Sequence, residues 1–171
     1  TQKEQEILAV RLTKLYLIIK GKLVSFIIKF SNGKIFCNLL NLLFKNDGNI
    51  KFNGKNYFKK ISDEKFIYYP NKRIQRILIN YEAHLERFMH SYNLDSIKFT
   101  DGDVIVDCGA NVGELNLALK SKKIHVKYIA FEPDLSTYEC CILNNESDKE
   151  NIHNVALSTN NDEKEFYQDS F

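Results

Sequence analysis

The stretch at 102–120, GDVIVDCGANVGELNLALK, constrains the fold of this chain more than any other. Its three β-branched residues at 104–106 favour a buried strand, and the residues at 114–120 favour a helix. The short loop between them begins with an acid, Asp107, and contains two glycines. A strand that runs through an acidic, glycine-containing loop into a helix predicts one βα unit of a parallel sheet.

The residues after this unit continue the alternation of strand and helix. A strand is expected over 126–132, a helix over 134–145, a strand over 151–158 and a further strand over 164–168. Alternating strands and helices with apolar strands indicate an α/β fold with a mainly parallel, doubly wound sheet covered on both faces.

The first hundred residues show a different pattern. Apolar residues recur at helical spacing over 4–44, which predicts two or three helices broken near Gly21 and at 31–33. Asn53-Gly54 stands between two short aromatic-rich runs and predicts a β-hairpin. A strand is then expected over 65–70 and a helix over 73–92. We therefore expect two parts, a helical region with a hairpin at 1–97 and the α/β domain at 98–171.

Charge is distributed unevenly along the chain. Residues 1–100 carry 18 Lys and Arg against 8 Asp and Glu, whereas residues 101–171 carry 6 against 14. The basic part could meet an anionic partner, such as a phospholipid surface or an acidic glycan, or it could simply attract the acidic part. The basic, apolar start of the chain fits a helix on a membrane surface, on its own domain or on a dimer partner.

The sequence argues against several kinds of binding partner. No run of 18 apolar residues is present, so no membrane span is expected, and peripheral membrane contact and a homo-oligomer stay open. We expect no nucleic acid partner. Neither the four cysteines nor the four histidines have metal-site spacing, so no metal is expected. The adjacent pair Cys140 and Cys141 is awkward for two disulfides, and no secretory signal opens the chain, which together favour the cytoplasm.

A second acid lies at the end of the next expected strand. Glu132 follows the apolar run at 128–131 and lies 25 residues after Asp107, which leaves room for one crossover helix. Adjacent parallel strands would bring both acids to one edge of the sheet, where a carboxylate can accept hydrogen bonds from ribose hydroxyls. A nucleoside ligand is therefore expected beyond the carboxyl ends of the strands.

The loop departs from the dinucleotide pattern G-x-G-x-x-G. The three glycine positions hold Gly109, Asn111 and Glu114, so two of the glycines are missing. An acid at the start of the helix would also repel a pyrophosphate there. A zwitterionic ligand without phosphate therefore suits the loop better than a dinucleotide.

The segments VIVDCGANVGE, YIAFEPD and NVALS together resemble the FkbM family of S-adenosylmethionine-dependent methyltransferases, which have the class I Rossmann-like fold. The resemblance covers about residues 98–167. It implies S-adenosylmethionine as the cofactor, and it assigns contacts to residues of three strand ends. The loop contacts beside the methionine part would be Asp107, Gly109, Ala110, Asn111 and Gly113, with Cys108 in the wall of the site. Glu132 would hold the ribose hydroxyls, and Pro133 and Asp134 would shape the turn beside the adenosine. Residues 154–157 would end the third strand near the adenine, with Ala156 as the contact.

The resemblance implies methyl transfer to an oxygen of a small molecule or glycan, and it leaves the catalytic base unassigned. A class I methyltransferase has seven strands, whereas 64 residues follow Asp107. We therefore expect either that the chain is the N-terminal portion of a longer protein or that a partner chain covers its first strand. Two alternatives stay open: a nicotinamide-dependent oxidoreductase, and a non-catalytic binding module with a basic, surface-docking start.

Overall fold

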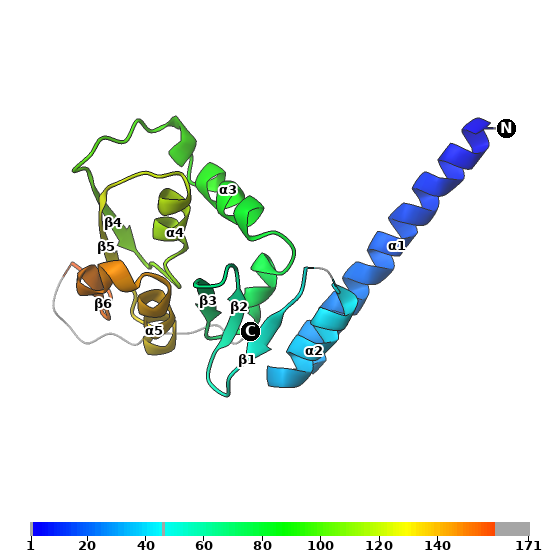
Figure 1. Ribbon diagram of the computed structural model, residues 1–171, viewed down its shortest axis with the longest axis horizontal. Helices are drawn as coiled ribbons and strands as arrows, with labels where there is room; N and C mark the ends of the chain where they lie inside the picture. The colour runs from blue at the N-terminus through cyan, green and yellow to red at the C-terminus, as the bar shows by residue number, and fades with distance from the viewer. Residues whose placement is uncertain (1, 46, 160–171) are drawn as a thin grey trace.

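The chain forms two small sheets and the helices that pack on them (Figure 1). The computed structural model describes residues 2–45 and 47–159, with side chains from Leu8 onward. Its N-terminal elements are α1 (Gln2–Phe30), α2 (Gly33–Leu43), β1 (Ile50–Phe52), β2 (Tyr57–Lys60), β3 (Phe66–Tyr69), the 3-10 helix η1 (Lys72–Ile77), α3 (Tyr81–Ser91) and η2 (Leu94–Ser96). Then follow β4 (Val104–Cys108), α4 (Glu114–Ser121), β5 (Lys127–Phe131), α5 (Leu135–Asn144), η3 (Glu146–Asn151) and β6 (Ile152–His153).

Helix α1 is longer than the sequence pattern predicts. It runs unbroken through Gly21, so the break expected there is wrong. A single glycine inside a helix costs only about 1 kcal/mol, which the neighbouring turns outweigh. The chain does break after Phe30, because Asn32 takes an extended conformation with φ of −140° before α2 begins.

The hairpin prediction is confirmed. Strands β1, β2 and β3 form an antiparallel sheet in that order, with β1 and β2 joined by the loop at 53–56. The side chain of Asn53 accepts hydrogen bonds from the backbone N–H groups of Lys55 (3.0 Å) and Asn56 (2.8 Å), which closes the turn.

The helix expected over 73–92 is divided into η1 and α3. The division falls at Asn80, which is extended with φ of −142° and accepts a hydrogen bond from the N–H of Ala83 at 2.9 Å. Asparagine competes for backbone groups in this way and is favoured at helix N-caps, so local capping overrides the apolar periodicity.

The parallel sheet lies in the C-terminal region. Its order is β4-β5-β6, and β4 pairs with β5 from Val104↔Lys127 to Cys108↔Phe131. Strand β6 is two residues long and ends at His153, so it is shorter than the strand predicted over 151–158. The strand expected over 164–168 lies outside the described residues. The chain is thus a mixed α/β fold with a three-stranded parallel sheet.

Both helices of this region lie on the same face of the parallel sheet (Figure 1). Tyr128 and Ala130 point toward them and are buried. On the other face Val104 and Val106 are 56% and 54% exposed. The expectation of a sheet covered on both faces is therefore wrong for the described part of the chain, because α4 and α5 both pack on the side of Tyr128.

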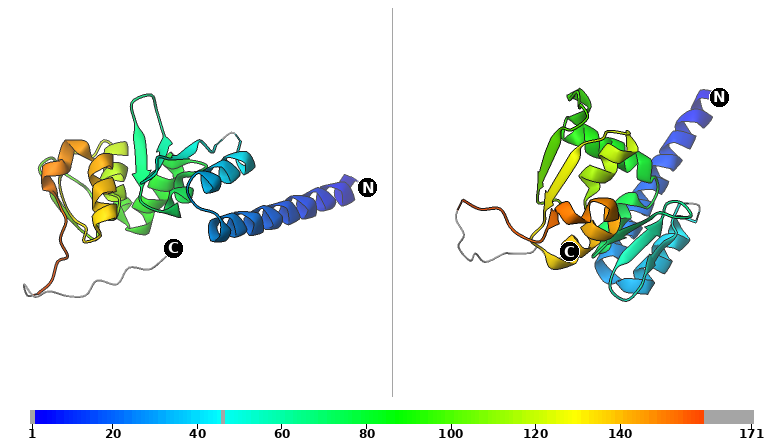
Figure 2. Two further views of the ribbon diagram at one scale, coloured as in Figure 1. Left: turned by 90° about the horizontal axis from the view of Figure 1, so that it is seen from below. Right: turned by 60° about the vertical axis from the view of Figure 1, so that its left-hand side comes forward.

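The N-terminal region packs on the outer side of these two helices. Helix α3 lies against α4, and β3 lies against α5 (Figures 1 and 2). One apolar core runs from α2 and the antiparallel sheet through α3 to Leu117, Leu119 and Cys140. Helix α1 leaves this body and extends away from it toward its N-terminus.

A buried lysine stabilises the junction between the antiparallel sheet and η1. Lys59 is 8% exposed, and its ammonium donates to the carbonyl oxygens of Asp47 (2.8 Å), Ile77 (2.9 Å) and Leu78 (2.6 Å). Burial lowers its pKa, against the raising effect of Asp47 and Glu82. All three donors of the ammonium are used, so its burial is compensated.

We expect Lys59→Met to destabilise the fold by about 2–4 kcal/mol, because three buried carbonyl groups lose their donor. Lys60→Met is the matched control, since that side chain is 50% exposed and bonds only to exposed Asp63 among the contacts described. The control should shift stability by less than about 0.5 kcal/mol. Urea unfolding followed by circular dichroism measures both, and equal midpoints for the two variants would contradict the role of Lys59.

Candidate functional site

The two acids singled out in the sequence lie at the same end of the parallel sheet. Asp107 is the penultimate residue of β4, and Glu132 directly follows β5. Because β4 and β5 are parallel neighbours with Asp107 opposite Ala130, both acids stand at the carboxyl edge. This is the edge at which open α/β sheets bind ligands.

The loop from Gly109 to Gly113 crosses the end of β5. The N–H groups of Gly109 and Ala110 both donate to the carbonyl oxygen of Phe131, at 2.8 and 3.0 Å. Gly109, Asn111 and Gly113 have positive φ angles of 82°, 51° and 79°. Glycine adopts this region freely, and asparagine tolerates it better than most residues, so this alternation explains the pattern G-A-N-V-G.

Glu132 is held by the backbone on both sides of its carboxylate. One oxygen accepts from the N–H of Asn111 at 2.8 Å and the other from the N–H of Asp134 at 3.0 Å. Its own N–H donates to the carbonyl of His153, and its carbonyl accepts from the side chain of Asn154. The carboxylate is therefore oriented by the loop, and each oxygen has a second lone pair for a further donor.

Asp107 lies on the helix-covered side of the sheet, beside Tyr128. The hydroxyl of Tyr128 donates to the Asp107 carboxylate at 2.6 Å. Burial raises the pKa of Asp107, and the hydrogen bond from Tyr128 opposes that rise. Burial and the neighbouring carboxylate raise the pKa of Tyr128, so this hydroxyl remains a donor.

The two glycines of the loop have opposite surroundings. A Cβ on Gly109 would meet no described atom within 4 Å, so the space in front of this residue is open. A Cβ on Gly113 would lie 2.1 Å from Nδ2 of Asn145 and 2.9 Å from the sulfur of Cys141. Gly109 thus permits close approach from outside, whereas Gly113 permits close packing of α4 on α5.

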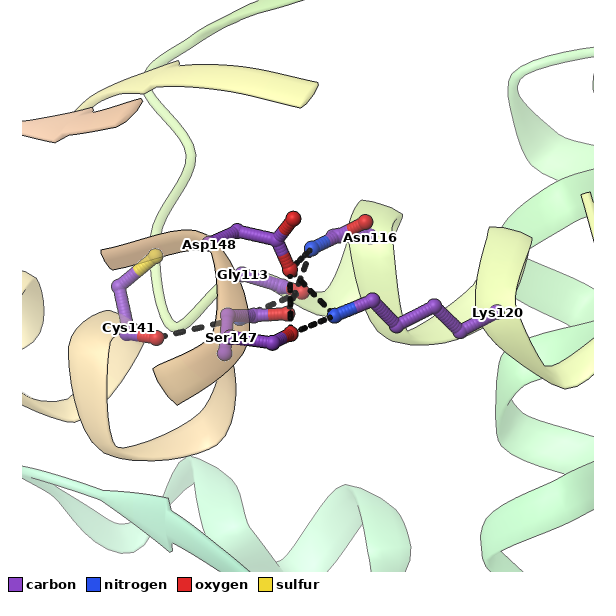
Figure 3. A network of polar contacts seen from close by, with 7 residues as sticks. Gly113, Asn116, Lys120, Cys141, Ser147 and Asp148 are labelled. Carbon is purple, nitrogen blue, oxygen red and sulfur yellow. Dashed lines mark hydrogen bonds and ion pairs between the residues drawn. The ribbon is translucent and has the colours of Figure 1, made fainter. Parts of the chain in front are cut away.

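A polar network connects the start of α4 to the end of α5 and to η3 (Figure 3). Asn145 donates to the carbonyl oxygens of Cys141 (3.1 Å) and Gly113 (3.4 Å) and accepts from Asn116 (3.0 Å). Lys120 donates to Asp148, which also accepts from Asn116 at 3.1 Å. The network joins α4 to η3. It therefore fixes the Gly113 end of the loop and leaves the space at Gly109 open.

Glu114 does not face the loop, which corrects the argument that its charge would repel a pyrophosphate. Its side chain is buried and turned toward the N-terminal region. There it accepts from the hydroxyl of Tyr69 at 2.7 Å and contacts Nε2 of His84 at 2.5 Å. Burial alone would raise the pKa of Glu114, but the contacts with His84 and Tyr69 and the charge of Arg76 leave it lowered. The missing glycines remain as the feature that distinguishes this loop from a dinucleotide loop.

The remaining predicted site residues divide between the rim and the surrounding structure. Pro133 follows Glu132 at the rim, and its carbonyl oxygen accepts a hydrogen bond from the side-chain amide of Asn154 at 3.0 Å. Asp134 is the N-cap of α5, where one oxygen accepts from the backbone and side chain of Thr137. Cys108 is an exposed free thiol on the open face of the sheet. Ala156 is exposed beyond the end of β6 and makes no described contact with the loop.

Sequence reasoning missed the residues that support the site. Tyr128 was treated as part of an apolar strand, yet its hydroxyl bonds Asp107. Asn144 donates to the carbonyl of Val112 and exchanges two hydrogen bonds with the backbone of Tyr68, which joins the loop to β3. No local pattern marks these contacts, because Asp107 lies 21 residues before Tyr128 and Tyr68 lies 76 residues before Asn144.

Comparisons with known proteins give no match: no family model matches the chain, and no curated protein matches it. Among the described residues no cluster of three or more His, Cys, Asp or Glu is suited to a metal ion. Nor does any helix in the described part combine the length and apolar character needed to cross a bilayer.

We expect Gly113→Ala to destabilise the fold by about 2–5 kcal/mol, because the positive φ and the contact with Asn145 both resist a Cβ. Gly109→Ala carries the φ strain alone and should cost about 1–2 kcal/mol. Thermal or urea unfolding of the two variants measures the difference. A Gly113→Ala protein as stable as the Gly109→Ala protein would contradict the close packing described here.

The lowered pKa of Glu114 predicts a pH dependence of stability. Its ionised form stabilises the fold above the unfolded-state value of about 4.3, and this contribution is lost as pH falls through the lower folded-state pKa. Glu114→Gln should therefore lower stability at pH 7 and flatten its decline below about pH 5. Urea midpoints from pH 7 to 3 test this, with Glu150→Gln as an exposed control. Parallel curves for wild type and Glu114→Gln would refute the assignment.

Proposed function

We propose that this protein is a methyltransferase that uses S-adenosylmethionine and resembles the FkbM family, with a class I Rossmann-like fold. The observation that carries the proposal is the carboxylate of Glu132, oriented by two backbone N–H groups at the carboxyl edge, next to the open loop at Gly109. The resemblance of the loop and of the Phe-Glu-Pro strand end to the FkbM family suggests S-adenosylmethionine as the cofactor.

Different groups of the site would contact different parts of S-adenosylmethionine. The free lone pairs of Glu132 would accept the two ribose hydroxyls, while the open side of Gly109 would admit the methionine part. Asp107 stands behind this loop, where its carboxylate would lie near the sulfonium cation of a bound cofactor. The order β4-β5-β6 is compatible with the first three strands of this fold.

Methyl transfer needs alignment of an acceptor oxygen with the sulfonium methyl and, for a hydroxyl, a base. We propose a small molecule or a glycan as the acceptor. In the described part of the chain β4 is an edge strand with one exposed face, and an acceptor could approach the site from that side.

Binding of S-adenosylhomocysteine, measured by isothermal titration calorimetry, tests the proposal. Gly109→Ala should weaken binding at least tenfold, because a Cβ occupies the open side of the loop. Gly102→Ala is the matched control: it has a positive φ of 94° and an equally open Cβ position, but it precedes β4 at the other end of the sheet. Its affinity should equal that of the wild type.

Two results would refute the proposed function. One is the absence of S-adenosylhomocysteine binding by the folded wild-type chain. The other is a rise in melting temperature with NAD and none with S-adenosylhomocysteine, which would assign the site to an oxidoreductase.

A further inference from the structure

Helix α1 carries an apolar stripe that the rest of the described chain does not cover. Its members recur at steps of three and four residues and therefore share one side of the helix. They are Leu8, Leu12, Leu15, Tyr16, Ile19, Leu23, Phe26 and Phe30, and each is between 44% and 65% exposed. The stripe spans 23 residues from Leu8 to Phe30, and its 22 steps of 1.5 Å make about 33 Å of helix.

The stripe continues onto α2. Ile35, Leu39 and Leu42 recur along the outer side of α2 and are 39–66% exposed, while Phe36 and Leu40 on its inner side are fully buried. Side chains of both helices line one shallow hollow of about 390 Å³, from Leu23, Phe26 and Phe30 of α1 to Ile35, Leu39 and Leu42 of α2. We call the stripe and these three α2 residues the apolar face of α1 and α2.

The body of the protein holds α1 by its other side and near its C-terminal end. Ile27 is 5% exposed, and the ammonium of Lys72 donates to the carbonyl oxygens of Ile28 (2.5 Å) and Ser31 (3.4 Å). The ammonium of Lys20 lies 4.0 Å from the ring centre of Phe44. These contacts leave the apolar face free, and Figures 1 and 2 show the N-terminal part of α1 projecting from the body.

From Leu8 onward, the charged side chains of these two helices are all cations. Residues 8–46 contain no Asp or Glu, and their cations are Arg11, Lys14, Lys20, Lys22, Lys29, Lys34 and Lys45. Arg11, Lys22 and Lys29 follow one edge of the stripe by helical spacing, and Lys34 adjoins Ile35 at the start of α2. An apolar side bordered only by cations is complementary to a surface with an apolar interior and anionic headgroups.

A second copy of the chain suits this face poorly. A two-stranded coiled coil needs apolar residues every 3.5 positions, and a seam begun at Leu8, Leu12, Leu15 and Ile19 would next bury Lys22 and later Lys29. The stripe instead advances by about 3.7 residues per step, which is closer to the 3.6 residues per turn of a straight helix than to the 3.5 of a left-handed coiled coil. Pairing two such helices would also oppose cations, since no acid is available over 8–46 to neutralise them.

We propose that the apolar face of α1 and α2 docks on an anionic phospholipid bilayer, with α1 lying parallel to the surface and its leucines and phenylalanines inserted below the headgroups. This docking does not rest on the proposed methyl transfer. It would hold the protein at a membrane and leave the carboxyl edge of the parallel sheet, which lies on a separate part of the chain, available to a ligand.

Sedimentation of the full chain with lipid vesicles tests the proposal. Binding should be strong on vesicles with 30% phosphatidylserine, weak on pure phosphatidylcholine, and reduced as salt rises from 50 to 500 mM. Ile19→Gln with Phe26→Gln should abolish it, because both apolar anchors are lost while charge and helix propensity are retained. Val10→Gln with Leu17→Gln is the matched control, since both residues are 60% exposed or more but lie off the stripe.

A charge variant separates the two parts of the interaction. Arg11→Gln, Lys22→Gln and Lys29→Gln together should weaken binding to anionic vesicles on the order of a hundredfold, at about fivefold for each cation. Circular dichroism of every variant checks that helix content is unchanged.

Three outcomes would overturn the proposal. The first is a wild-type chain that stays in the supernatant with anionic vesicles at 50 mM salt. The second is equal loss of binding in the stripe variant and in the Val10 and Leu17 control. The third is a dimer in sedimentation velocity that the stripe variant dissociates, which would make a second copy the occupant of this face.

Discussion

The carbonyl oxygen of Phe131 and the carboxylate of Glu132 together hold the loop on which this structure depends. They accept hydrogen bonds from three consecutive backbone N–H groups, those of Gly109, Ala110 and Asn111. Such a course across the end of a neighbouring strand requires alternate residues in the left-handed region, and the sequence supplies glycine, asparagine and glycine at those places. The position of the loop in turn fixes where α4 begins, and with it the packing of the remaining elements.

Through the first residue of α4 the loop is joined to the N-terminal region. Glu114 is a buried acid, and a buried charge is costly unless it is paired and hydrogen-bonded. Tyr69 and His84 supply those partners from β3 and α3, so the carboxylate links three elements that are far apart in the sequence. Asn144 makes a second link from α5 to both β3 and the loop. The N-terminal region is therefore part of the support of the candidate site and not merely an appendage.

Two apolar surfaces remain uncovered in the described chain, and their chemistry differs. The open face of the parallel sheet presents Val104 and Val106, in a geometry that α/β proteins cover with further helices. The apolar face of α1 and α2 is bordered by lysine and arginine and stands away from the body. The first surface suits more protein of the same fold, whereas the second suits an anionic lipid surface. Under this proposal, some of the lysines and arginines of the first hundred residues would contact anionic headgroups.

Local chemistry in the sequence was sufficient for the hairpin, for the first βαβ unit of the parallel sheet and for the rim. The run at 104–106, the glycine-containing loop and the acid after 128–131 predict β4, α4 and β5 and bring Asp107 and Glu132 to one edge, because parallel strands share their carboxyl ends. Asn53-Gly54 predicts the hairpin for an equally local reason, the turn geometry that these residues favour.

Tertiary structure alone decided which way the polar groups point and which faces are covered. The sequence predicts Glu114 as a charge at the start of a helix, but its burial against His84 and Tyr69 turns it from the loop. No local pattern marks Lys59 as buried, yet three carbonyl groups enclose its ammonium. Helix periodicity also could not show that α1 continues through Gly21 or that α4 and α5 share one face. These outcomes depend on partners tens of residues distant, and a pattern of neighbours along the chain carries no information about them.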